Sequence, residues 1–359
     1  MRRVTKIAAV VLSGSLGMAS LAACGSNAGS TPSTPSSAAS GGASGGSSTL
    51  KVGMAYDVGG RGDFSFNDSA GRGLDKAKST LGVQVKELQA TPTDSDADRA
   101  ARLDQLASNG YNPIVAVGFA YAAALKTEAA KFPNVKFAIV DDASNTAPNI
   151  TNLVFTEEQS SYLAGVAAAL KSKTGTVGFI GGVDVPLIHK FQAGYQAGVK
   201  SVKPGDKVLV KYLTPASNFA GFSSPNLGKA AAEGQLSQGA DVIYSAAGSS
   251  GNGSIEAVAA KPGAWAIGVD SDQYTQPGLA KYKNSILTSA VKNVDIAVFD
   301  FIKSVSDGQP LTGTQTFNLA KGGVGLATSG GFIADIKPQL DAATADITSG
   351  KVVVPTTTS

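Results

Sequence analysis

Side chains suited to holding a small ligand follow the apolar runs of this sequence one after another. The first run ends at Asp57, and the loop over residues 57–70 crowds three aspartates, two phenylalanines, an asparagine and three glycines into one turn. Later runs are followed by Gly118, Phe119, Asp141, Gly248, Asp270 and Lys292. Glycine and aspartate are ordinary turn residues, but their recurrence after so many runs favours a binding site.

Two parts of the first loop are open to more than one interpretation. Arg61-Gly62-Asp63 spells a cell-adhesion tripeptide, but matches of three residues arise by chance, and we treat it as the least informative part of the loop. Phe64 and Phe66 are two positions apart and cannot share one helical face. One of them is therefore expected to pack while the other reaches a ligand, and we favour Phe66 for the ligand.

The sequence gives little support for a catalytic site or a metal-binding site. His189 is the only histidine and Cys24 the only cysteine, which excludes a His-rich metal site and an internal disulfide. Asp94, Asp96 and Asp98 resemble half of a calcium loop but lack its central glycine and terminal glutamate, so an acidic helix start is the better interpretation. We expect a binding protein that uses no cofactor and performs no chemistry.

The elements that must position these residues alternate between apolar runs and amphipathic stretches. The expected strands are 50–55, 83–88, 113–117, 136–140, 151–155, 176–180, 207–213, 242–246, 265–269 and 286–291. The expected helices are 66–81, 97–109, 120–131, 158–171, 187–202, 226–238, 252–260, 294–307 and 336–348. Continuous apolar runs are typical of strands covered on both faces, and strand–helix repetition predicts parallel sheets. Ligands of such sheets bind beyond the carboxyl ends of the strands, where the polar residues lie.

The start of the chain does not follow this pattern. Residues 1–23 have a basic beginning and an apolar run that closes on Leu-Ala-Ala before Cys24, which predicts a secretory signal peptide. A transmembrane anchor is the alternative, but the run is short and interrupted by serine and glycine. The ending resembles a bacterial lipobox, so Cys24 is the expected lipidation site. Residues 24–49 are almost wholly small and uncharged, and they predict a flexible tether.

Charge and length restrict the remaining body. The formal net charge of +3 comes from the three basic residues of the expected signal, and without them 27 basic residues balance 27 acidic ones. Neither nucleic acid nor an anionic surface is therefore an expected partner. The roughly 310 residues of the body are too many for one ordinary core and indicate two domains.

Four blocks of the body carry a family resemblance. They are GGRGDFSFNDSAGRGLDKA, VFTEEQSSYLAGVAAALKSKTGTVGFIGGVDVPLIHKFQAGYQAGVK, NLGKAAAEGQLSQGADVIYSAAGSSGNGSIEA, and WAIGVDSDQY followed by ILTSAVKNVDIAVFDFI. In order and over nearly all of residues 50–308, they resemble the basic membrane protein (BMP) family of substrate-binding lipoproteins. The sequence departs from the family at Arg61-Gly62-Asp63, and its stretch around Phe219 and Phe222 is longer than usual. Which of these two phenylalanines faces the ligand stays open.

The resemblance implies a fold and a function. The fold is α/β, with two doubly wound parallel-sheet lobes like those of type I periplasmic binding proteins, three crossovers and a ligand in the cleft between the lobes. Lobe 1 would comprise residues 50–156 and 292–310, and lobe 2 residues 157–291 and 311–350. The function would be that of a monomeric, lipid-anchored receptor on the extracytoplasmic face of the cell membrane. It would deliver a nucleoside, with purines preferred, to the permease of an ABC importer.

The resemblance also suggests roles for individual residues. Phe66 would stack on the base, Asp57 and Asp141 would contact polar atoms, and Asp270 and Lys292 would bind the ribose. Asn67 is either a ligand contact or a helix N-cap, and Lys292 is alternatively a solvated surface residue. The full set of expected ligand-binding residues is Asp57, Phe66, Asn67, Phe119, Asp141, Phe222, Gly248, Asp270 and Lys292. A sugar receptor on the same fold and a nucleoside-cleaving enzyme are the rival functions.

Overall fold

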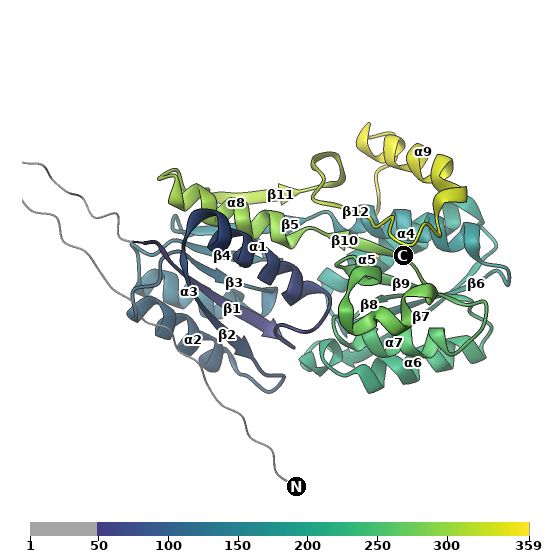
Figure 1. Cartoon of the computed structure of the whole chain (residues 1–359), viewed down its shortest axis with the longest axis horizontal. Coiled ribbons are helices and arrows are strands. Elements are labelled where there is room, and N and C mark those ends of the chain that lie inside the picture. Colours follow the sequence, from purple (N-terminus) through teal and green to yellow (C-terminus); the bar gives the residue numbers. More distant parts are fainter. Residues whose placement is uncertain (1–48, 359) are drawn as a thin grey trace, which may run out of the picture. The chain divides into compact units, whose positions relative to one another are not determined.

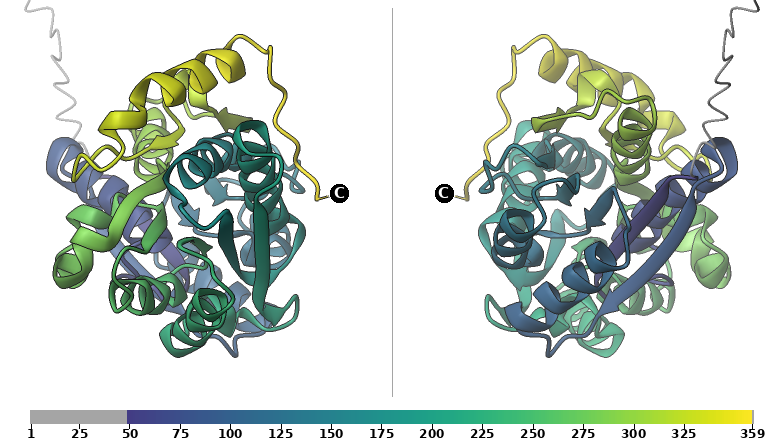
Figure 2. Two further views of the ribbon diagram at one scale, coloured as in Figure 1. Left: turned by 90° about the vertical axis from the view of Figure 1, so that its right-hand side faces the viewer. Right: turned by 90° about the vertical axis from the view of Figure 1, so that its left-hand side faces the viewer.

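The computed structural model describes residues 49–358. The expected signal peptide, Cys24 and all but the last residue of the expected tether lie outside the described residues. The described chain builds two sheets, each with helices on both faces (Figures 1 and 2). We call them lobe 1 and lobe 2. Within residues 49–358, no helix is both long enough and apolar enough to cross a membrane.

The sheet of lobe 1 is entirely parallel. Its strands, in order across the sheet, are β11 (Gly313–Phe317), β5 (Ile150–Phe155), β4 (Phe137–Val140), β3 (Ile114–Ala116), β1 (Lys51–Val58) and β2 (Gln84–Ala90). One face packs on α1 (Phe66–Leu81) and α8 (Val294–Ser306), and the other on α2 (Asp96–Ser108) and α3 (Ala122–Lys131). Alternate residues of the strands enter the two clusters, which explains why the strand runs are continuously apolar.

The sheet of lobe 2 is parallel except at one edge. Its strands are, in order, β12 (Val324–Leu326), β10 (Ile286–Lys292), β9 (Trp265–Asp270), β8 (Val242–Ala246), β6 (Thr176–Asp184) and β7 (Lys207–Pro215), and only β12 runs antiparallel to its neighbour. One face carries α4 (Glu157–Lys171) and α5 (Pro186–Val202), with α9 (Lys337–Thr348) packed on α4. The other face carries α6 (Pro225–Ser237) and α7 (Ser250–Ala259). The predicted fold class is confirmed.

The chain passes between the lobes three times, from β5 to α4, from β10 to α8, and from β11 to β12. The boundary expected at residue 311 is wrong, because β11 pairs with β5 and extends the sheet of lobe 1. The polar run Gly-Thr-Gln-Thr-Phe gave no strand signal. An edge strand needs apolar side chains on few positions, so its pairing partner rather than its composition decides its structure.

Asp94, Asp96 and Asp98 lie at the start of α2, as the sequence indicated. Ser95 and Asp98 form a reciprocal capping box, in which the Ser95 hydroxyl accepts from the Asp98 N–H and Asp98 accepts from the Ser95 N–H. Asp94 pairs with Arg102. Among the described residues, no group of three or more His, Cys, Asp or Glu side chains could hold a metal ion.

Candidate ligand-binding site

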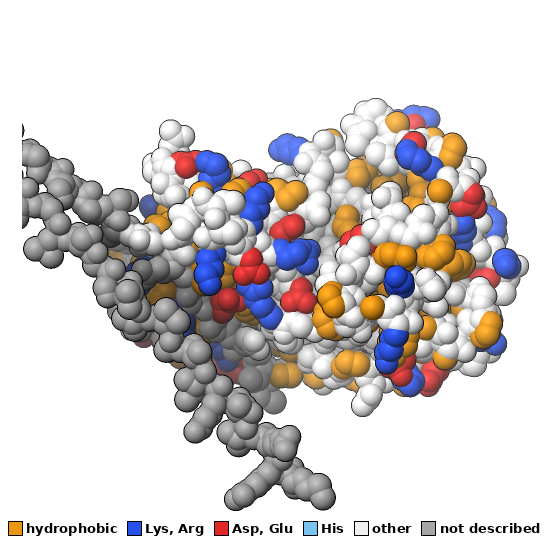
Figure 3. Space-filling model, in the orientation of Figure 1, with side chains coloured by type: hydrophobic (Ala, Val, Ile, Leu, Met, Phe, Trp, Pro, Cys, Tyr) orange, Lys and Arg blue, Asp and Glu red, His pale blue; other side chains and the backbone are white. Residues whose placement is uncertain are grey.

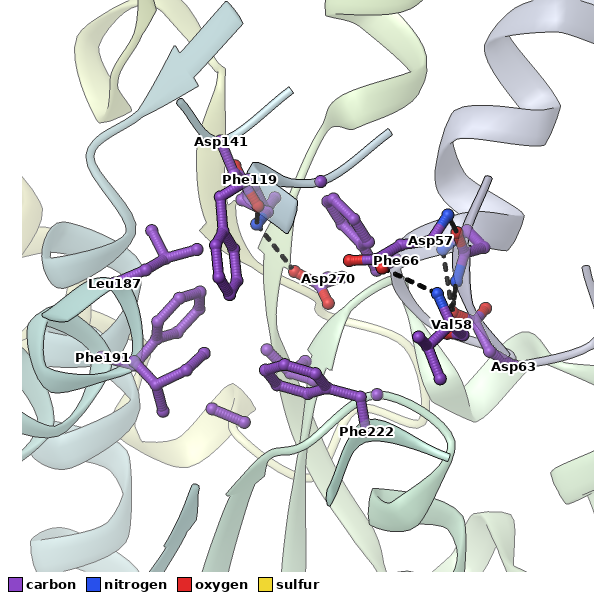
Figure 4. A pocket seen from close by; sticks show the side chains of 17 residues that line it. Asp57, Val58, Asp63, Phe66, Phe119, Asp141, Leu187, Phe191, Phe222 and Asp270 are labelled. Carbon is purple, nitrogen blue, oxygen red and sulfur yellow. Dashed lines mark hydrogen bonds and ion pairs between the residues drawn. The ribbon is translucent and has the colours of Figure 1, made fainter. Parts of the chain in front are cut away.

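A pocket lies between the lobes at the carboxyl ends of their strands (Figure 4). It contains about 540 Å³ of atom-free space including its open mouth. We call this space between the lobes the slot. All nine residues expected from the sequence line it: Asp57, Phe66, Asn67, Phe119, Asp141, Phe222, Gly248, Asp270 and Lys292. Their contact with a ligand remains a prediction.

Lys292 is the cation of the pocket. It is the last residue of β10, its side chain is 3% exposed, and its Nζ lies 2.6 Å from Asp141 Oδ2 and 3.6 Å from Asp270 Oδ1. Asp141 follows β4 in lobe 1 and Asp270 ends β9 in lobe 2, so one amine links carboxylates of both lobes. Burial by itself lowers the pKa of Lys292, but the neighbouring carboxylates, Asp141 first, outweigh it and hold that pKa above its ordinary value. The alternative interpretation of Lys292 as a solvated surface residue is therefore wrong.

Asp141 and Asp270 share a strained backbone conformation. Their φ angles of 67° and 63° fall in the left-handed region that residues other than glycine seldom adopt. Both residues follow or end a buried strand, and both carboxylates lie beside Lys292. Burial raises the pKa of Asp270, and Lys292 opposes that rise. The Oδ1 atom of each aspartate has no hydrogen-bond partner among the described residues, although Asp270 Oδ1 lies within ion-pair distance of Lys292.

Asp57 is the second-to-last residue of β1, and it lines the pocket from lobe 1. It is 6% exposed, its Oδ1 accepts a hydrogen bond from the Val58 N–H (2.8 Å), and burial raises its pKa to about 6. Gly118 provides the space for it. A Cβ at Gly118 would lie 2.3 Å from Asp57 Oδ2, and the φ of Gly118 is 99°, so any side chain there would displace the carboxylate.

The amide of Asn67 is used within the protein. Its Oδ1 accepts from the Asp57 N–H (3.0 Å), and its Nδ2 donates to the Val58 carbonyl (3.3 Å) and to Asp63 Oδ2 (3.1 Å). Asn67 is the second residue of α1, and Ser65 occupies the N-cap position. The N-cap alternative is therefore wrong. Asn67 ties the end of β1 to the start of α1 and so positions Asp57.

Asp63 also lines the pocket, which the sequence reasoning missed. Its carboxylate accepts backbone hydrogen bonds from Ser65 (2.9 Å), Asn67 (2.8 Å) and Asp68 (3.1 Å), and so satisfies the free N–H groups around the start of α1. Burial raises its pKa to about 6. An acidic residue just before a helix start was the signal that could have identified it.

Arg61 anchors the same loop from the outside. Its guanidinium lies 2.6 Å from Glu87 and 2.8 Å from Asp75, which are on β2 and α1 respectively. Together with Asp63, it holds both sides of the turn that places Phe66. Calling Arg61-Gly62-Asp63 the least informative part of the loop was therefore wrong.

Four phenylalanine rings surround the open space in Figure 4, and they are Phe66, Phe119, Phe191 and Phe222. Phe66 is the first residue of α1, and Phe222 ends the short helix η2 (Phe219–Phe222) of lobe 2. The pocket thus takes Phe66 rather than Phe64 and Phe222 rather than Phe219. Lys292 Nζ lies 4.5 Å from the centroid of the Phe66 ring. Gly248 has a φ of 53°, and a Cβ atom on it would lie 2.8 Å from the carbonyl oxygen of Phe222. The absence of a side chain therefore lets the Gly248 backbone lie close to Phe222.

The first two turns of α5 supply lining residues that were not predicted. They are Leu187, Ile188 and Phe191. Positions one turn apart lie on one helix face, so the apolar residues of Pro-Leu-Ile-His-Lys-Phe directly after β6 were a usable signal. His189, on the same turn, points elsewhere and has its Nε2 2.7 Å from Asp184 Oδ1.

The charge of the pocket differs from that of the surface. Four carboxyl groups line it (Asp57, Asp63, Asp141 and Asp270) against the single amine of Lys292. On the face of the molecule shown in Figure 3, basic and acidic side chains are interspersed. The pocket is therefore locally acidic inside a chain of balanced charge, and it disfavours anionic ligands.

Comparisons with known proteins agree with this geometry. Residues 50–358 match the family model "ABC transporter substrate-binding protein PnrA-like" (Bmp). The chain belongs to this family. The resemblance to basic membrane proteins is thereby confirmed, and the family consists of substrate-binding proteins of ABC transporters rather than enzymes.

Relatives and a solved structure cover nearly the whole body. The chain is 34% identical over 328 residues to the "CD4+ T-cell-stimulating antigen" of Listeria monocytogenes, covering 86% of this chain and 89% of that protein. It is 34% identical over 326 residues to the "ABC transporter nucleoside-binding protein BmpA" of Lactococcus lactis, covering 85% and 89%. A crystal structure of an ABC transporter solute-binding protein from Aeropyrum pernix superposes with a TM-score of 0.73 at 30% identity, covering 85% and 94%. The fold is that of type I periplasmic binding proteins.

Proposed function

We propose that this Bmp-family protein is a lipid-anchored extracytoplasmic receptor that captures a nucleoside, preferably a purine nucleoside, between its lobes and delivers it to an ABC importer. The observation that carries the proposal is the slot lined by phenylalanine rings from both lobes together with a carboxylate–lysine–carboxylate group. The Lactococcus lactis relative is named as a nucleoside-binding protein, which supports the same ligand class.

Each part of a nucleoside has a matching group in the slot. Phe66 and Phe222 would cover the base, and stacking on aromatic rings contributes about 1–3 kcal/mol per base. Asp57 and Asp141 offer acceptors for donor groups of the base edge. Asp270 accepts and Lys292 donates, which suits vicinal ribose hydroxyls. A ligand held in this way touches both lobes and stabilises their closed arrangement.

Membrane attachment belongs to the same proposal. The lipobox-like Leu-Ala-Ala-Cys24 would give the mature chain a lipid at Cys24, and residues 25–49 would hold the body away from the membrane surface. Replacing Cys24 with serine should move the protein from the membrane fraction to the soluble fraction of cells that express it. Retention in the membrane fraction would contradict lipid anchoring.

Calorimetry tests the ligand. Residues 25–359 should be titrated with adenosine, guanosine, cytidine and ribose, and a purine nucleoside should bind most tightly. Tighter binding of ribose would favour the sugar-receptor alternative. Incubation with excess guanosine should leave it intact, because the proposal includes no chemistry, and release of free guanine would favour the enzyme alternative.

A further inference from the structure

Two of the phenylalanines that line the pocket, Phe66 in lobe 1 and Phe222 in lobe 2, each have a phenylalanine nearby in sequence that does not line it. Phe64 lies two residues before Phe66, and Phe219 lies three residues before Phe222. Both neighbours cross to the opposite lobe instead. Their contacts assign them a function separate from that of the rings that face the ligand.

Phe64 projects from lobe 1 into lobe 2. Its ring packs against the hydrophobic cluster that includes Leu279 and Tyr282, on the face of the lobe 2 sheet covered by α6 and α7. The ring sits directly on Gly278 in η4 (Pro277–Ser285), because a Cβ there would lie 2.1 Å from Phe64 Cζ. Phe64 reaches this place with a φ of 57°, a left-handed conformation that non-glycine residues adopt only when surrounding contacts enforce it.

Side chains of lobe 2 hold the backbone on both sides of Phe64. Gln273 Nε2 donates to the Phe64 carbonyl (3.1 Å), Ser271 Oγ donates to the Ser65 carbonyl (2.6 Å), and Asn252 Nδ2 donates to the Asp63 carbonyl (3.1 Å). These partners are about two hundred residues away along the chain. The turn that starts α1 is therefore bound by lobe 2 at three consecutive peptide groups.

Phe219 makes the opposite crossing, from lobe 2 to lobe 1. Its ring centroid lies 5.8 Å from that of Phe119 and 5.2 Å from Arg99 Cζ. Arg99 is 2% exposed, and its Nε and Nη2 atoms have no hydrogen-bond partner among the described residues. A desolvated guanidinium against an aromatic face makes a stronger contact than an exposed one.

We propose that Phe64 and Phe219 are positioning residues for ligand binding that form a reciprocal aromatic latch between the lobes. Neither contacts the ligand; each stabilises the closed arrangement in which the slot exists. The inference rests on the proposed function, in which a ligand bridges the lobes. Because apparent affinity scales with the fraction of molecules in the competent arrangement, loss of a latch residue weakens binding without changing which ligand is preferred.

The latch also couples closure to the rings that face the ligand. Phe64 and Phe66 belong to one turn, and Phe219 and Phe222 belong to one short helix. Seating the first residue of each pair in the opposite lobe therefore fixes the direction of the second. This coupling predicts a larger effect on ligand dissociation than on association, since dissociation requires the latch to release.

Equilibrium binding and stopped-flow kinetics with adenosine and guanosine test the latch in residues 25–359. Phe64→Ala and Phe219→Ala should each raise Kd by about tenfold, by the same factor for both nucleosides, mainly through faster dissociation. Phe299→Ala is the matched control, because this half-buried ring on α8 packs within lobe 1 and should leave Kd unchanged. Unchanged Kd in both latch variants, or a change in preference between the nucleosides, would overturn the proposal.

Gly278→Ala provides an independent test, since its methyl group occupies the seat of the Phe64 ring. It should raise Kd in the wild-type background and have little further effect beside Phe64→Ala, because both changes empty the same contact. If the increases in Kd caused by Gly278→Ala and Phe64→Ala were additive, the contact between Gly278 and the Phe64 ring would not be the one that supports binding.

The latch can also be separated from the choice of ligand. If no nucleoside binds the wild-type protein, the proposed function fails, and small-angle X-ray scattering of the ligand-free proteins still decides the latch. The Phe64→Ala/Phe219→Ala double variant should then have a larger radius of gyration than the wild type and the Phe299→Ala control. Equal radii would refute the latch.

Discussion

Lys292 joins the two lobes through Asp141 and Asp270, and its removal is the most informative perturbation of the site. In Lys292→Met the side chain keeps its unbranched shape but is one atom shorter and loses its charge, so two buried carboxylates face each other without a cation. Breaking a buried ion pair from one side destabilises proteins by about 3–5 kcal/mol. The carboxylates can limit this loss by binding a proton. At pH 7, neutralising an aspartate of ordinary pKa costs about 4 kcal/mol, so the two routes are comparable.

We therefore expect Lys292→Met to lose about 3–4 kcal/mol of unfolding free energy at pH 7. For a body of about 310 residues the melting temperature should fall by roughly 5–6 °C. The unpaired carboxylates have raised pKa values in the folded variant, so the folded state binds more protons than the unfolded state. The contribution of these two carboxylates to stability is therefore highest at low pH and is lost as pH rises through the raised pKa values. The deficit relative to the wild type should thus be small at pH 4.5 and large at pH 7.5.

Thermal unfolding of ligand-free protein at several pH values measures this effect. Lys303→Met is the matched control, because Lys303 pairs with Asp307 at the surface, where both side chains are about half exposed and removal should have little effect. Lys292→Met/Asp141→Asn should recover part of the loss, since one of the unpaired charges is gone. A melting temperature within 1–2 °C of the wild type at pH 7.5, or no recovery in the double variant, would refute the linking role of Lys292.

Three further expectations concern the pocket and its surroundings. Phe66→Ala and Asp270→Ala should each weaken nucleoside binding at least tenfold, about 1.4 kcal/mol. Unchanged calorimetric affinity in both variants would mean that the wrong residues were assigned. A purine nucleoside 5′-monophosphate should bind at least about a hundredfold more weakly than its nucleoside, because four carboxyl groups and one already paired amine line the slot. Comparable affinity of the two ligands in a competition titration would contradict the acidic character of the site. Glu157, at the crossover into α4, is buried, and that burial raises its pKa to about 7. Glu157→Gln should therefore raise the melting temperature at pH 8 relative to the wild type but not at pH 5. An equal shift at both pH values would show that the ionised carboxylate is not destabilising.

The sequence was most informative where a structural signal is local. The ten predicted strands and nine predicted helices of the body all occur, because a continuous apolar run or a helical period is a property of neighbouring residues. The position of a polar residue directly after such a run was also readable. It placed Asp57, Asp141 and Asp270 at the carboxyl ends of β1, β4 and β9, and thus at the edge of the sheets where a ligand binds.

Local signals failed where a contact partner decides the outcome. The strand β11 has an unremarkable polar sequence and exists because β5 offers it a free edge. Asp63 looked like part of a chance tripeptide, although its carboxylate organises the start of α1. Both errors concern residues whose own composition carries little information about their neighbours in space.

By itself, the sequence determined the class of fold, the family and the list of residues that could form a cleft. Only the tertiary structure decided which of them act together. The contact of Lys292 with Asp141 joins residues 151 positions apart, and Phe64 meets Gln273 across 209 positions. The choice between Phe64 and Phe66, and between Phe219 and Phe222, likewise depends on the opposite lobe. Periodicity describes the nearest turns of the chain, whereas the placement of the two lobes determines which side chains line the pocket and which contact the opposite lobe.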